Sequence, residues 1–420
     1  MPLRLVSLLG IVVLIALAWA LSNNRRSFPW RTVLWGLGLQ FFFALFILKT
    51  PVGQRLFAGA QYAVNQINVY ANEGAKMVFG PLAAGDALKA VFGPAQGYIF
   101  AVSITATIIL VSALSSLLYH WRILQRVVAA MAWVMQRSMG TSGVESLGAA
   151  SNTFLGQTEG ALLIKPYLPT MTPSEIMALM TCGFSTIASG VMAVYAGLEG
   201  LTAGHIVTAS ALGAPAGLMM AKVMFPESEP PPAGARSLAG FGVEKTAVNG
   251  IDALCRGASE GLMLALNVLG MLIAFVAVIA LLNGLFLGAQ HAVGLPGVTL
   301  QQVMGWLNAP FAWLMGVPAK DCATVGQMLG ERIVLNEFVG YLDLSTFVTT
   351  HPGQLDSRSV TLASYALCGF ANFGSIAIQI GGIGALAPAR RGDLARIGLR
   401  AMIAGLLACY LFASVIGVIL

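Results

Sequence analysis

Long apolar stretches alternate with short polar segments along the chain. Each stretch reaches the roughly 17 residues that a helix needs to cross a hydrocarbon core of about 30 Å. The pattern therefore predicts an all-α polytopic membrane protein with eight transmembrane helices. We place these helices at residues 5–21, 31–49, 98–119, 174–197, 201–224, 258–288, 358–386 and 394–420.

Two segments between these spans are amphipathic. Residues 50–97 mix apolar and polar positions and contain Gly, Pro and Asn, which predicts an external loop with one or two amphipathic helices. Residues 121–139 carry their Arg and Gln side chains within one arc of about 120° on a helical wheel. A helix of this kind lies along the membrane surface, and we expect it on the cytoplasmic side.

Two further segments are apolar overall but contain Gly, Pro and charged residues near their middles. They cover residues 142–172 and 318–344, and each is too polar to cross the membrane alone. Irregular backbone at membrane depth is tolerated where it packs in protein or lines a wet cavity, so both segments are predicted to be re-entrant hairpins. Three spans separate them, and an odd number of crossings places the hairpins on opposite sides of the membrane.

The hairpins belong to an internal repeat. Leu-Gly at 155–156 recurs 174 residues later at 329–330, and Cys-Gly-Phe at 182–184 recurs 186 residues later at 368–370. In each copy a hairpin, a broken helix and a further span follow one another, and the two copies have opposite orientations. An inverted repeat with broken helices predicts a transport site where the copies meet.

This repeat divides the chain into five predicted parts. Residues 1–120 form a scaffold of three transmembrane helices, and residues 121–139 form the cytoplasmic interfacial helix. Repeat 1 covers residues 140–224 and repeat 2 covers residues 318–420. Residues 225–317 between the repeats contain a cytoplasmic loop, the sixth span and an interfacial helix.

Composition agrees with a membrane protein and excludes other classes. The chain is 57% hydrophobic and only 10% charged, so it has more apolar surface than a soluble fold can bury, and membrane lipid must cover the remainder. The net charge is +6, but Lys and Arg are scattered at the ends of apolar runs, which argues against a nucleic-acid partner. The five Cys residues form no Cys-x-x-Cys pair, so neither a disulfide nor a zinc site is implied.

The distribution of positive charge predicts the topology. The loops at 22–32, 120–137 and 388–400 are rich in Arg, and all three are cytoplasmic if the N-terminus lies outside. The loop at 225–257 is then cytoplasmic too, and its three consecutive Pro residues at 230–232 predict a flexible linker. Eight spans place both termini outside the cytoplasm, and we expect the protein in a bacterial inner membrane.

The N-terminal residues also have the pattern of a secretory signal peptide. Arg4 precedes an apolar run that ends in Ala-Trp-Ala at 18–20. However, three Arg residues follow by position 31, and such charges resist translocation. We therefore predict an uncleaved first span, with a cleaved signal as the alternative.

Polar residues of both hairpins are candidates for a binding site. A charged residue at the bilayer centre costs at least about 2.5–3.5 kcal/mol, so Glu159 and Glu337 are unlikely to be accidental, although a buried carboxylate that only holds its hairpin together is the alternative. We predict two opposite walls with no obvious Arg clamp, which suit a neutral polyhydroxylated or amide-bearing solute. The first wall contains Gln157, Thr158 and Glu159, and the second contains Glu337, Asn372 and Ser375. Arg332 is a nearby cation whose direction the sequence leaves open.

The broken helices are candidates for ion binding. Thr186 and Asn372 occupy equivalent positions in the two repeats, each followed by Ser and Gly residues. A helix that unwinds there exposes backbone carbonyls, which together with Thr and Asn oxygens can coordinate Na⁺. Close helix packing is the alternative explanation for the small residues.

Three motifs together resemble the concentrative nucleoside transporters, and the resemblance covers nearly the whole chain. The motifs are Gly156-Gln157-Thr158-Glu159 with Lys165-Pro166-Tyr167, then Leu335-Asn336-Glu337-Phe338-Val339-Gly340-Tyr341, and Cys368-Gly369-Phe370-Ala371-Asn372-Phe373. Three positions differ from the usual family pattern: Gly160-Ala161 stands where the family usually has Ala-Pro, and Gly374 where it usually has Ser. The difference at Gly374 removes one hydroxyl beside the implied ribose site.

The resemblance implies an ion-coupled nucleoside symporter, usually a homotrimer, in which a transport domain moves against a scaffold. It implies that Gln157, Thr158, Glu159 and Val191 hold the nucleobase, and that Glu337, Asn372 and Ser375 hold the ribose with Phe370 packed nearby. The implied Na⁺ ligands are the Asn152 side chain, the Leu155 carbonyl, the Thr186 hydroxyl and the Ile187 carbonyl. Sodium is the expected coupling ion, and a proton is the alternative.

Two rival classes remain. An intramembrane enzyme would require a catalytic set in a wet cleft, yet of the four His residues only His205 falls inside a predicted span, so we expect no enzyme activity. A secondary transporter of another small polar solute would share the architecture. Competition of uridine uptake by nucleosides and by amino acids separates that reading from a nucleoside transporter.

Overall fold

The computed structural model describes residues 2–93, 99–228, 247–294 and 297–420, and within these ranges the chain is helical with no strand. Six helices precede the first repeat. They are α1 (Leu3–Ala20), α2 (Trp30–Lys49), α3 (Pro51–Phe79), α4 (Gly85–Phe92), α5 (Phe100–His120) and α6 (Ile123–Met139). Two amphipathic helices, α3 and α4, therefore fill most of the segment predicted as an external loop.

The first repeat and its connection to the second contain seven helices. They are α7 (Gly143–Asn152), α8 (Glu159–Leu162), α9 (Pro173–Ser185), α10 (Ser189–Ala196), α11 (Ala203–Met224), α12 (Gly250–Ala292) and α13 (Leu300–Leu314). The second repeat contains α14 (Cys322–Val334), α15 (Glu337–Thr350), α16 (Ser357–Ala366), α17 (Phe373–Leu386) and α18 (Arg391–Ile419). The order of helices agrees between the two repeats, but the short α8 and the 3₁₀-helix at Lys165–Thr170 stand in the first repeat where α15 is one continuous helix in the second.

Seven helical segments in the described part of the chain are long and apolar enough to span a membrane. They correspond to seven of the eight predicted spans. The remaining one, at 358–386, consists of α16 and α17, which are each too short to cross alone because six residues interrupt them. The spans thus follow the hydrophobic pattern, and the interrupted one carries part of the candidate site.

Two predicted boundaries were wrong. The sixth span extends from Gly250 to Ala292 rather than from 258 to 288, because its polar first turns continue the helix, with Asn249 as the cap that accepts a hydrogen bond from the Asp252 amide. The second hairpin continues to Thr350 instead of ending at 344. The proline linker predicted at 230–232 lies outside the described residues.

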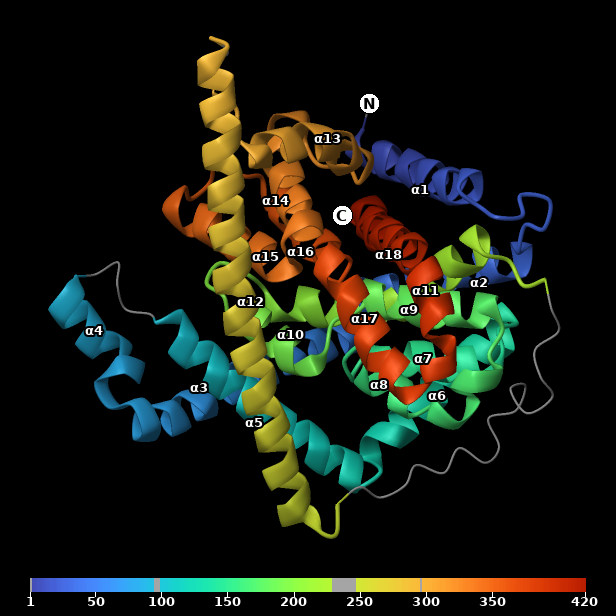
Figure 1. Ribbon diagram of the computed structural model, residues 1–420, viewed down its shortest axis with the longest axis horizontal. Helices are drawn as coiled ribbons and strands as arrows, with labels where there is room; N and C mark the ends of the chain where they lie inside the picture. The colour runs from blue at the N-terminus through green and yellow to red at the C-terminus, as the bar shows by residue number, and fades with distance from the viewer. Residues whose placement is uncertain (1, 94–98, 229–246, 295–296) are drawn as a thin grey trace.

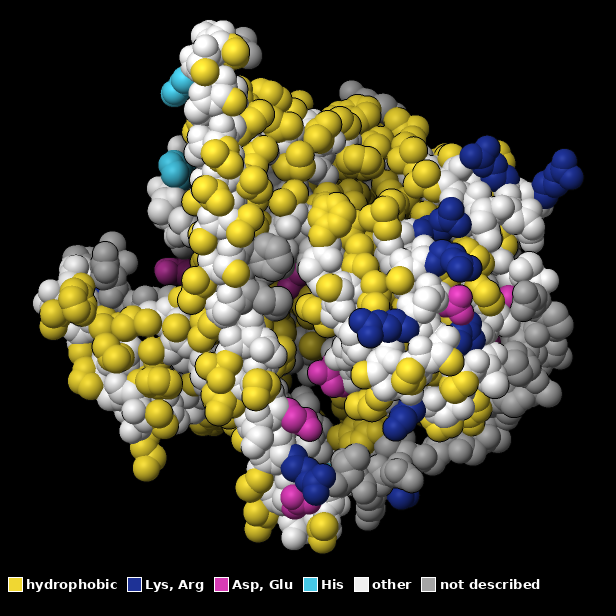
Figure 2. Space-filling view, in the orientation of Figure 1, with side chains coloured by type: hydrophobic (Ala, Val, Ile, Leu, Met, Phe, Trp, Pro, Cys, Tyr) yellow, Lys and Arg dark blue, Asp and Glu magenta, His cyan; other side chains and the backbone are white. Residues whose placement is uncertain are grey.

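Helices near the centre differ sharply from those at the periphery in burial. The best membrane-spanning windows of α9–α10, α11 and α18 are 83%, 89% and 83% buried, whereas that of α12 is 12% buried. In Figure 1, α12 runs along one side of the bundle, and α3 and α4 project away from it. Figure 2 shows that apolar side chains cover these peripheral helices, as expected for contact with lipid or another apolar surface.

Buried polar contacts fix both hairpins to the bundle. Lys222 on α11 forms a buried ion pair with Glu145 on α7, with 2.6 Å between Nζ and Oε2, and its ammonium also donates to Ser174 on α9 at 2.9 Å. In the second repeat, Asp321 before α14 accepts a hydrogen bond from Ser359 on α16. Removal of one partner of a buried ion pair is strongly destabilising, because the other charge then stays buried without a partner. These contacts therefore position the ends of the hairpins relative to the helices that carry the breaks.

Candidate functional site

The broken helices unwind close to the predicted positions. Between α9 and α10 the chain is extended at Thr186 (φ −126°, ψ 168°), and between α16 and α17 Asn372 is extended (φ −138°, ψ 163°). The second break begins earlier than predicted, directly after Ala366, and it includes Gly369 at φ 148°, a conformation that favours glycine. Ser189 and Ser375 were expected within the breaks but are helical, because the chain re-enters α-helix at Ser189 and at Phe373.

Two asparagine side chains cap helices of the second repeat. Asn336 caps α15, which starts at Glu337, and Asn372 caps α17. The Asn336 side chain accepts a hydrogen bond from the Val339 amide at 3.1 Å, so α15 begins with Glu337 in its first turn. The Asn372 side chain accepts from the Ser375 amide at 2.8 Å in the same way. Asparagine favours this position because its side-chain oxygen satisfies an amide that has no partner within the helix. The caps therefore fix both residues at the points where helices begin.

These elements surround a cavity of about 130 Å³. One water requires roughly 10–15 Å³ on this scale, so the cavity holds several waters or part of a small polar solute. All eight residues predicted to bind substrate line it: Gln157, Thr158, Glu159, Val191, Glu337, Phe370, Asn372 and Ser375. The structure therefore brings together residues that are far apart in the sequence and come from both repeats.

Glu337 is the buried acidic group of this cavity. Its Oε1 accepts a hydrogen bond from the Tyr195 hydroxyl at 2.7 Å, and its Oε2 accepts from Asn372 Nδ2 at 3.0 Å. Neither partner belongs to its own hairpin, so these bonds do not simply hold the hairpin together. A carboxylate has about four lone-pair positions, so it can accept from further donors beyond these two side chains.

The first hairpin contributes a different set of groups. Gln157 is buried, and its Oε1 accepts a hydrogen bond from Nε2 of Gln379 on α17 at 3.0 Å. The amide nitrogen of Gln157 takes no part in this bond. Thr158 donates to Glu159 at 3.2 Å, and Glu159 is exposed, unlike Glu337. The two carboxylates thus differ in environment, and this wall presents amide, hydroxyl and carboxylate groups together.

The four predicted sodium ligands lie where the first hairpin meets the first break. Asn152 is buried; its Nδ2 donates to the Leu179 carbonyl at 3.2 Å, and its Oδ1 has no hydrogen-bond partner. The Thr186 hydroxyl donates to the Cys182 carbonyl at 2.8 Å, which leaves its oxygen lone pairs available. The amide of Ser189 donates to the Phe154 carbonyl at 3.2 Å and joins the hairpin to the break beside Leu155 and Ile187. An unpaired buried amide oxygen of this kind is a ligand that a hard cation such as Na⁺ accepts.

Gly160 leaves the space that the Asn152 side chain occupies. A Cβ atom at Gly160 would lie 2.2 Å from Asn152 Oδ1, so the asparagine would have to move. The absence of a side chain at Gly160 therefore helps to set where Asn152 Oδ1 lies in this chain.

Arg332, whose direction the sequence left open, does not line the cavity. Its side chain is fully buried, and it donates to the carbonyls of Ala366 and Gly369 at the second break. The cavity therefore has no guanidinium among its lining residues. This composition matches the prediction of a site for a neutral solute.

Family models cover most of the chain. Residues 9–82 match the model for the N-terminus of Na⁺-dependent nucleoside transporters, residues 101–202 match a nucleoside recognition (gate) domain, and residues 205–417 match the C-terminus of Na⁺-dependent nucleoside transporters. The chain belongs to the concentrative nucleoside transporter family. Members of this family are sodium-dependent transporters and not enzymes, and the chain is accordingly a multi-pass membrane protein.

Full-length relatives agree with this assignment. The transporter is 36% identical to the nucleoside permease NupC of Helicobacter pylori, over 98% of this chain and 97% of the relative. It is 37% identical to sodium/nucleoside cotransporter 1 of Rattus norvegicus, over 100% of this chain and 64% of the longer relative. It is also 43% identical to an uncharacterized transporter of Haemophilus influenzae, over 98% of this chain and 96% of the relative.

Solved structures in two states resemble the transporter. CNTnw in an inward-facing, substrate-bound state is 36% identical with a TM-score of 0.92, over 99% of this chain and 97% of that chain. A doubly substituted CNTnw in an outward-facing state is also 36% identical, with a TM-score of 0.93 over 99% and 98% of the two chains. Similarity to both states supports nucleoside transport by alternating access.

Sequence reasoning missed several residues that line the transporter's cavity or contact its lining residues. Tyr195 lies one turn after Val191 on α10 and contacts Glu337, and Gln379 lies one turn after Ser375 on α17 and contacts Gln157. An i, i+4 search from the predicted residues would have found both. Leu264 and Val268 on α12 also line the cavity, but they stand in a uniformly apolar run that gives no signal.

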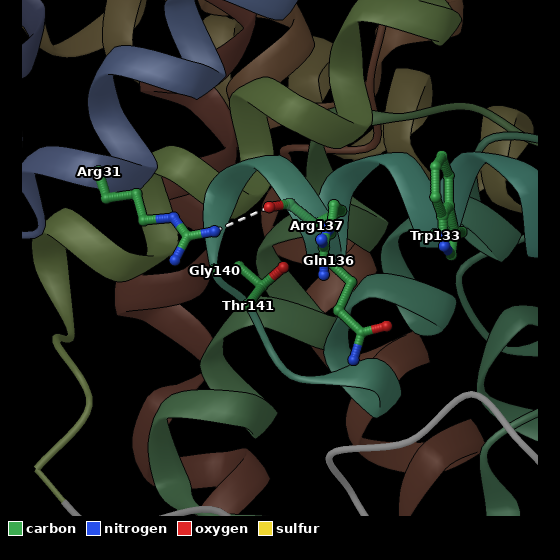
Figure 3. Close-up of a pocket in the computed structure, with 6 residues that line it drawn as sticks. All are labelled: Arg31, Trp133, Gln136, Arg137, Gly140 and Thr141. Carbon is green, nitrogen blue, oxygen red and sulfur yellow. Dashed lines mark hydrogen bonds between the residues drawn. The ribbon is translucent and has the colours of Figure 1, made fainter.

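A second hollow in the transporter lies outside this site. It measures about 390 Å³ and is lined by residues of α6 and of the start of α2 (Figure 3). Arg31 on α2 donates to the carbonyls of Arg137 at 2.7 Å and Ser138 at 3.0 Å, and so satisfies the C-terminal end of α6. Its guanidinium thus has a structural partner, and we assign the hollow no ligand.

Proposed function

We propose that this chain is a sodium-coupled symporter that takes up nucleosides such as uridine. The carrying observation is the buried Glu337 carboxylate, which lines a cavity formed by both repeats and has acceptor capacity beyond its bonds to Tyr195 and Asn372. The vicinal hydroxyls of a ribose are suitable donors to such a carboxylate. A solute lacking one hydroxyl leaves part of a buried acceptor unpaired, so nucleosides are preferred over deoxynucleosides and free bases.

The opposite wall is proposed to hold the nucleobase. Gln157, Thr158 and Glu159 offer donors and acceptors to a base edge, directly or through water, and Val191 and Phe370 supply apolar contact. Asn372 and Ser375 complete the ribose side. Such a mixed wall accepts more than one base, which supports a nucleoside carrier of moderate base selectivity.

Sodium is proposed as the coupling ion, held by the Asn152 side chain, the Leu155 carbonyl, the Thr186 hydroxyl and the Ile187 carbonyl. The unpaired Asn152 Oδ1 supports this assignment. One cation crossing a potential of roughly 100 mV releases about 2.3 kcal/mol. At about 1.4 kcal/mol per decade this sustains a nucleoside concentration ratio of about 40–50.

We further propose a homotrimer in a bacterial inner membrane with both termini outside the cytoplasm. The sparsely buried surface of α12 and the projecting α3 and α4 support contacts with other copies or with lipid. The two repeats, residues 140–224 and 318–420, would move as a transport domain against a scaffold that includes residues 1–120. The interfacial helix at 121–139 and the connection at 225–317 would then join the two parts.

Uptake by purified protein in proteoliposomes tests this proposal. We expect an inward sodium gradient to accelerate accumulation of labelled uridine at least about 10-fold over a matched choline gradient, and excess unlabelled nucleosides, but not amino acids, to compete. Uptake that ignores sodium and follows a proton gradient would identify the proton as the coupling ion. Competition by amino acids alone would identify a transporter of another small solute.

A further inference from the structure

Two acidic side chains join the arms of the second hairpin. Glu331 on α14 and Asp343 on α15 lie six residues before and six residues after Glu337. The two helices lie side by side in Figure 1, and the carboxyl groups of Glu331 and Asp343 are within hydrogen-bonding range of each other. The pair therefore bridges the hairpin around the residue that we assign to the ribose.

This acidic pair lacks a group that would balance it. Glu331 is only 7% exposed; its Oε1 accepts a hydrogen bond from Gln327 Nε2 at 3.1 Å, but its buried Oε2 has no donor. Asp343 is half-buried, and neither carboxylate forms an ion pair with any described residue. A buried acceptor without a donor is costly, and two carboxylates in contact repel each other unless one of them holds a proton.

The neighbouring elements supply no cation to the pair within the described part of the chain. α13, which packs on α14, contains no ionisable residue. Arg332 on α14 donates to carbonyls at the second break, and Arg358 on α16 donates to the carbonyls of Gly316 and Gly417. The other ionisable side chains near the hairpin form hydrogen bonds elsewhere, namely Glu337, Tyr341, His351, Tyr365, Cys409 and Tyr410.

The first hairpin has no such pair. Glu331 lies 174 residues after Gln157, which is the offset of the repeated Leu-Gly, so a neutral amide stands at the equivalent position of the first repeat. Gln157 contacts Gln379 of the other repeat rather than an acid of its own hairpin. The shared architecture therefore does not require a carboxylate at this position.

We propose that Glu331 and Asp343 bind one proton between them and that this proton clamps the two arms of the second hairpin. Asp343 is partly exposed, so water can deliver the proton and accept it again. When the proton leaves, the two negative charges repel, the arms separate and Glu337 between them loses its position. Low pH therefore favours uptake, although this proton is not the ion that drives it. Both acids are positioning residues, since neither lines the cavity.

The pH dependence of uptake tests the proposal, with saturating sodium and the same pH on both sides of the membrane. We expect the initial rate of uridine uptake by the unmodified protein to fall at least about 5-fold between about pH 6 and about pH 9, because the shared proton is lost as pH rises. A rate that does not fall over this range would overturn the proposal.

Two substitutions replace the shared proton by a permanent donor. In Glu331→Gln the amide oxygen still accepts from Gln327 and the amide nitrogen donates to Asp343, whereas in Asp343→Asn the amide donates to Glu331. Both variants should keep the low-pH rate over the whole range and so exceed the unmodified protein at high pH. Glu73→Gln on α3 removes an exposed carboxylate and should retain the unmodified pH profile. A fall of the unmodified size in both hairpin variants would overturn the proposal.

A measurement without transport separates this inference from the proposed function, on which its uptake test rests. The midpoint temperature of thermal unfolding in detergent should decrease as pH rises in the unmodified protein, and decrease less in both hairpin variants. Equal decreases would contradict the shared proton. A sodium titration that shifts in Glu331→Gln at constant pH would indicate a sodium ion between the carboxylates and would also contradict it. Absence of sodium-driven uridine uptake in the unmodified protein would refute the proposed function, whereas the unfolding comparison would still test the acidic pair.

Discussion

Replacement of Glu337 by Gln is expected to reduce uridine uptake at least about 100-fold. The variant replaces a carboxylate that accepts from Tyr195 and Asn372 and has acceptor capacity left for a solute hydroxyl. An amide has a single acceptor oxygen, so at least one ribose hydroxyl meets a donor instead. The lost hydrogen bond to a charged acceptor contributes roughly 1.5–3 kcal/mol, and the hydroxyl left unpaired costs about 1 kcal/mol more, which together amount to about 3 kcal/mol. Initial rates of uridine uptake and the concentration for half-maximal uptake measure the effect.

Two controls make this result specific. Glu73→Gln on α3 removes an exposed carboxylate that pairs with Lys76, and its uptake should equal that of the unmodified protein. Comparison of uridine with 2′-deoxyuridine should show a smaller preference in the Glu337 variant than in the unmodified protein. Unaltered affinity and rate in Glu337→Gln would exclude Glu337 from the substrate site.

The second large effect concerns sodium. We expect Asn152→Ala and Thr186→Val each to raise the sodium concentration for half-maximal uptake at least about 10-fold, because each removes one oxygen from the proposed ion site, equivalent to about 1.4 kcal/mol or more. Thr186→Val preserves shape while removing the hydroxyl that lies at the first break. Sodium titration of uridine uptake in proteoliposomes provides the measurement.

Thr181 on α9 is the matched control for this substitution. It is buried on the same helix, and its hydroxyl oxygen has no hydrogen-bond partner, so Thr181→Val should leave the sodium titration unchanged and not reduce stability. A shift of the same size in Thr181→Val and Thr186→Val would indicate a general effect on α9. Normal sodium dependence in both Asn152→Ala and Thr186→Val would place the coupling ion elsewhere.

The sequence predicts the fold well where the bilayer dictates the pattern. Seven spans follow from apolar length, since a helix in lipid has to present apolar residues for its whole crossing. The boundaries of α12 and α15 were less accurate because their ends are polar, and polarity alone does not distinguish a loop from a helix that extends beyond the membrane. The second break was predicted to begin too late: the cap at Asn372 is visible in the sequence, whereas residues 367–371 before it contain one Gly among apolar residues and no Pro.

The candidate site, like the fold, could be predicted from the sequence only in part. Its six polar residues could be predicted because polarity within an apolar segment is rare and costly, and they line one cavity together with Val191 and Phe370, which the family resemblance implied. The partners that orient them could not be predicted directly. Gln379 contacts Gln157 across 222 residues, and Tyr195 contacts Glu337 across 142 residues. Such pairings depend on how the repeats fold against each other, which no local pattern encodes.

The hydrogen bond between Tyr195 and Glu337 also bears on how such a protein originates. The tyrosine belongs to the first copy of the repeated unit and the glutamate to the second, so neither copy alone completes the acidic centre of the cavity. An ancestral polypeptide with a single copy would have needed a second molecule to form an equivalent site. Gene duplication and fusion would then have made a contact between two chains permanent within one, and would have freed each half to specialise.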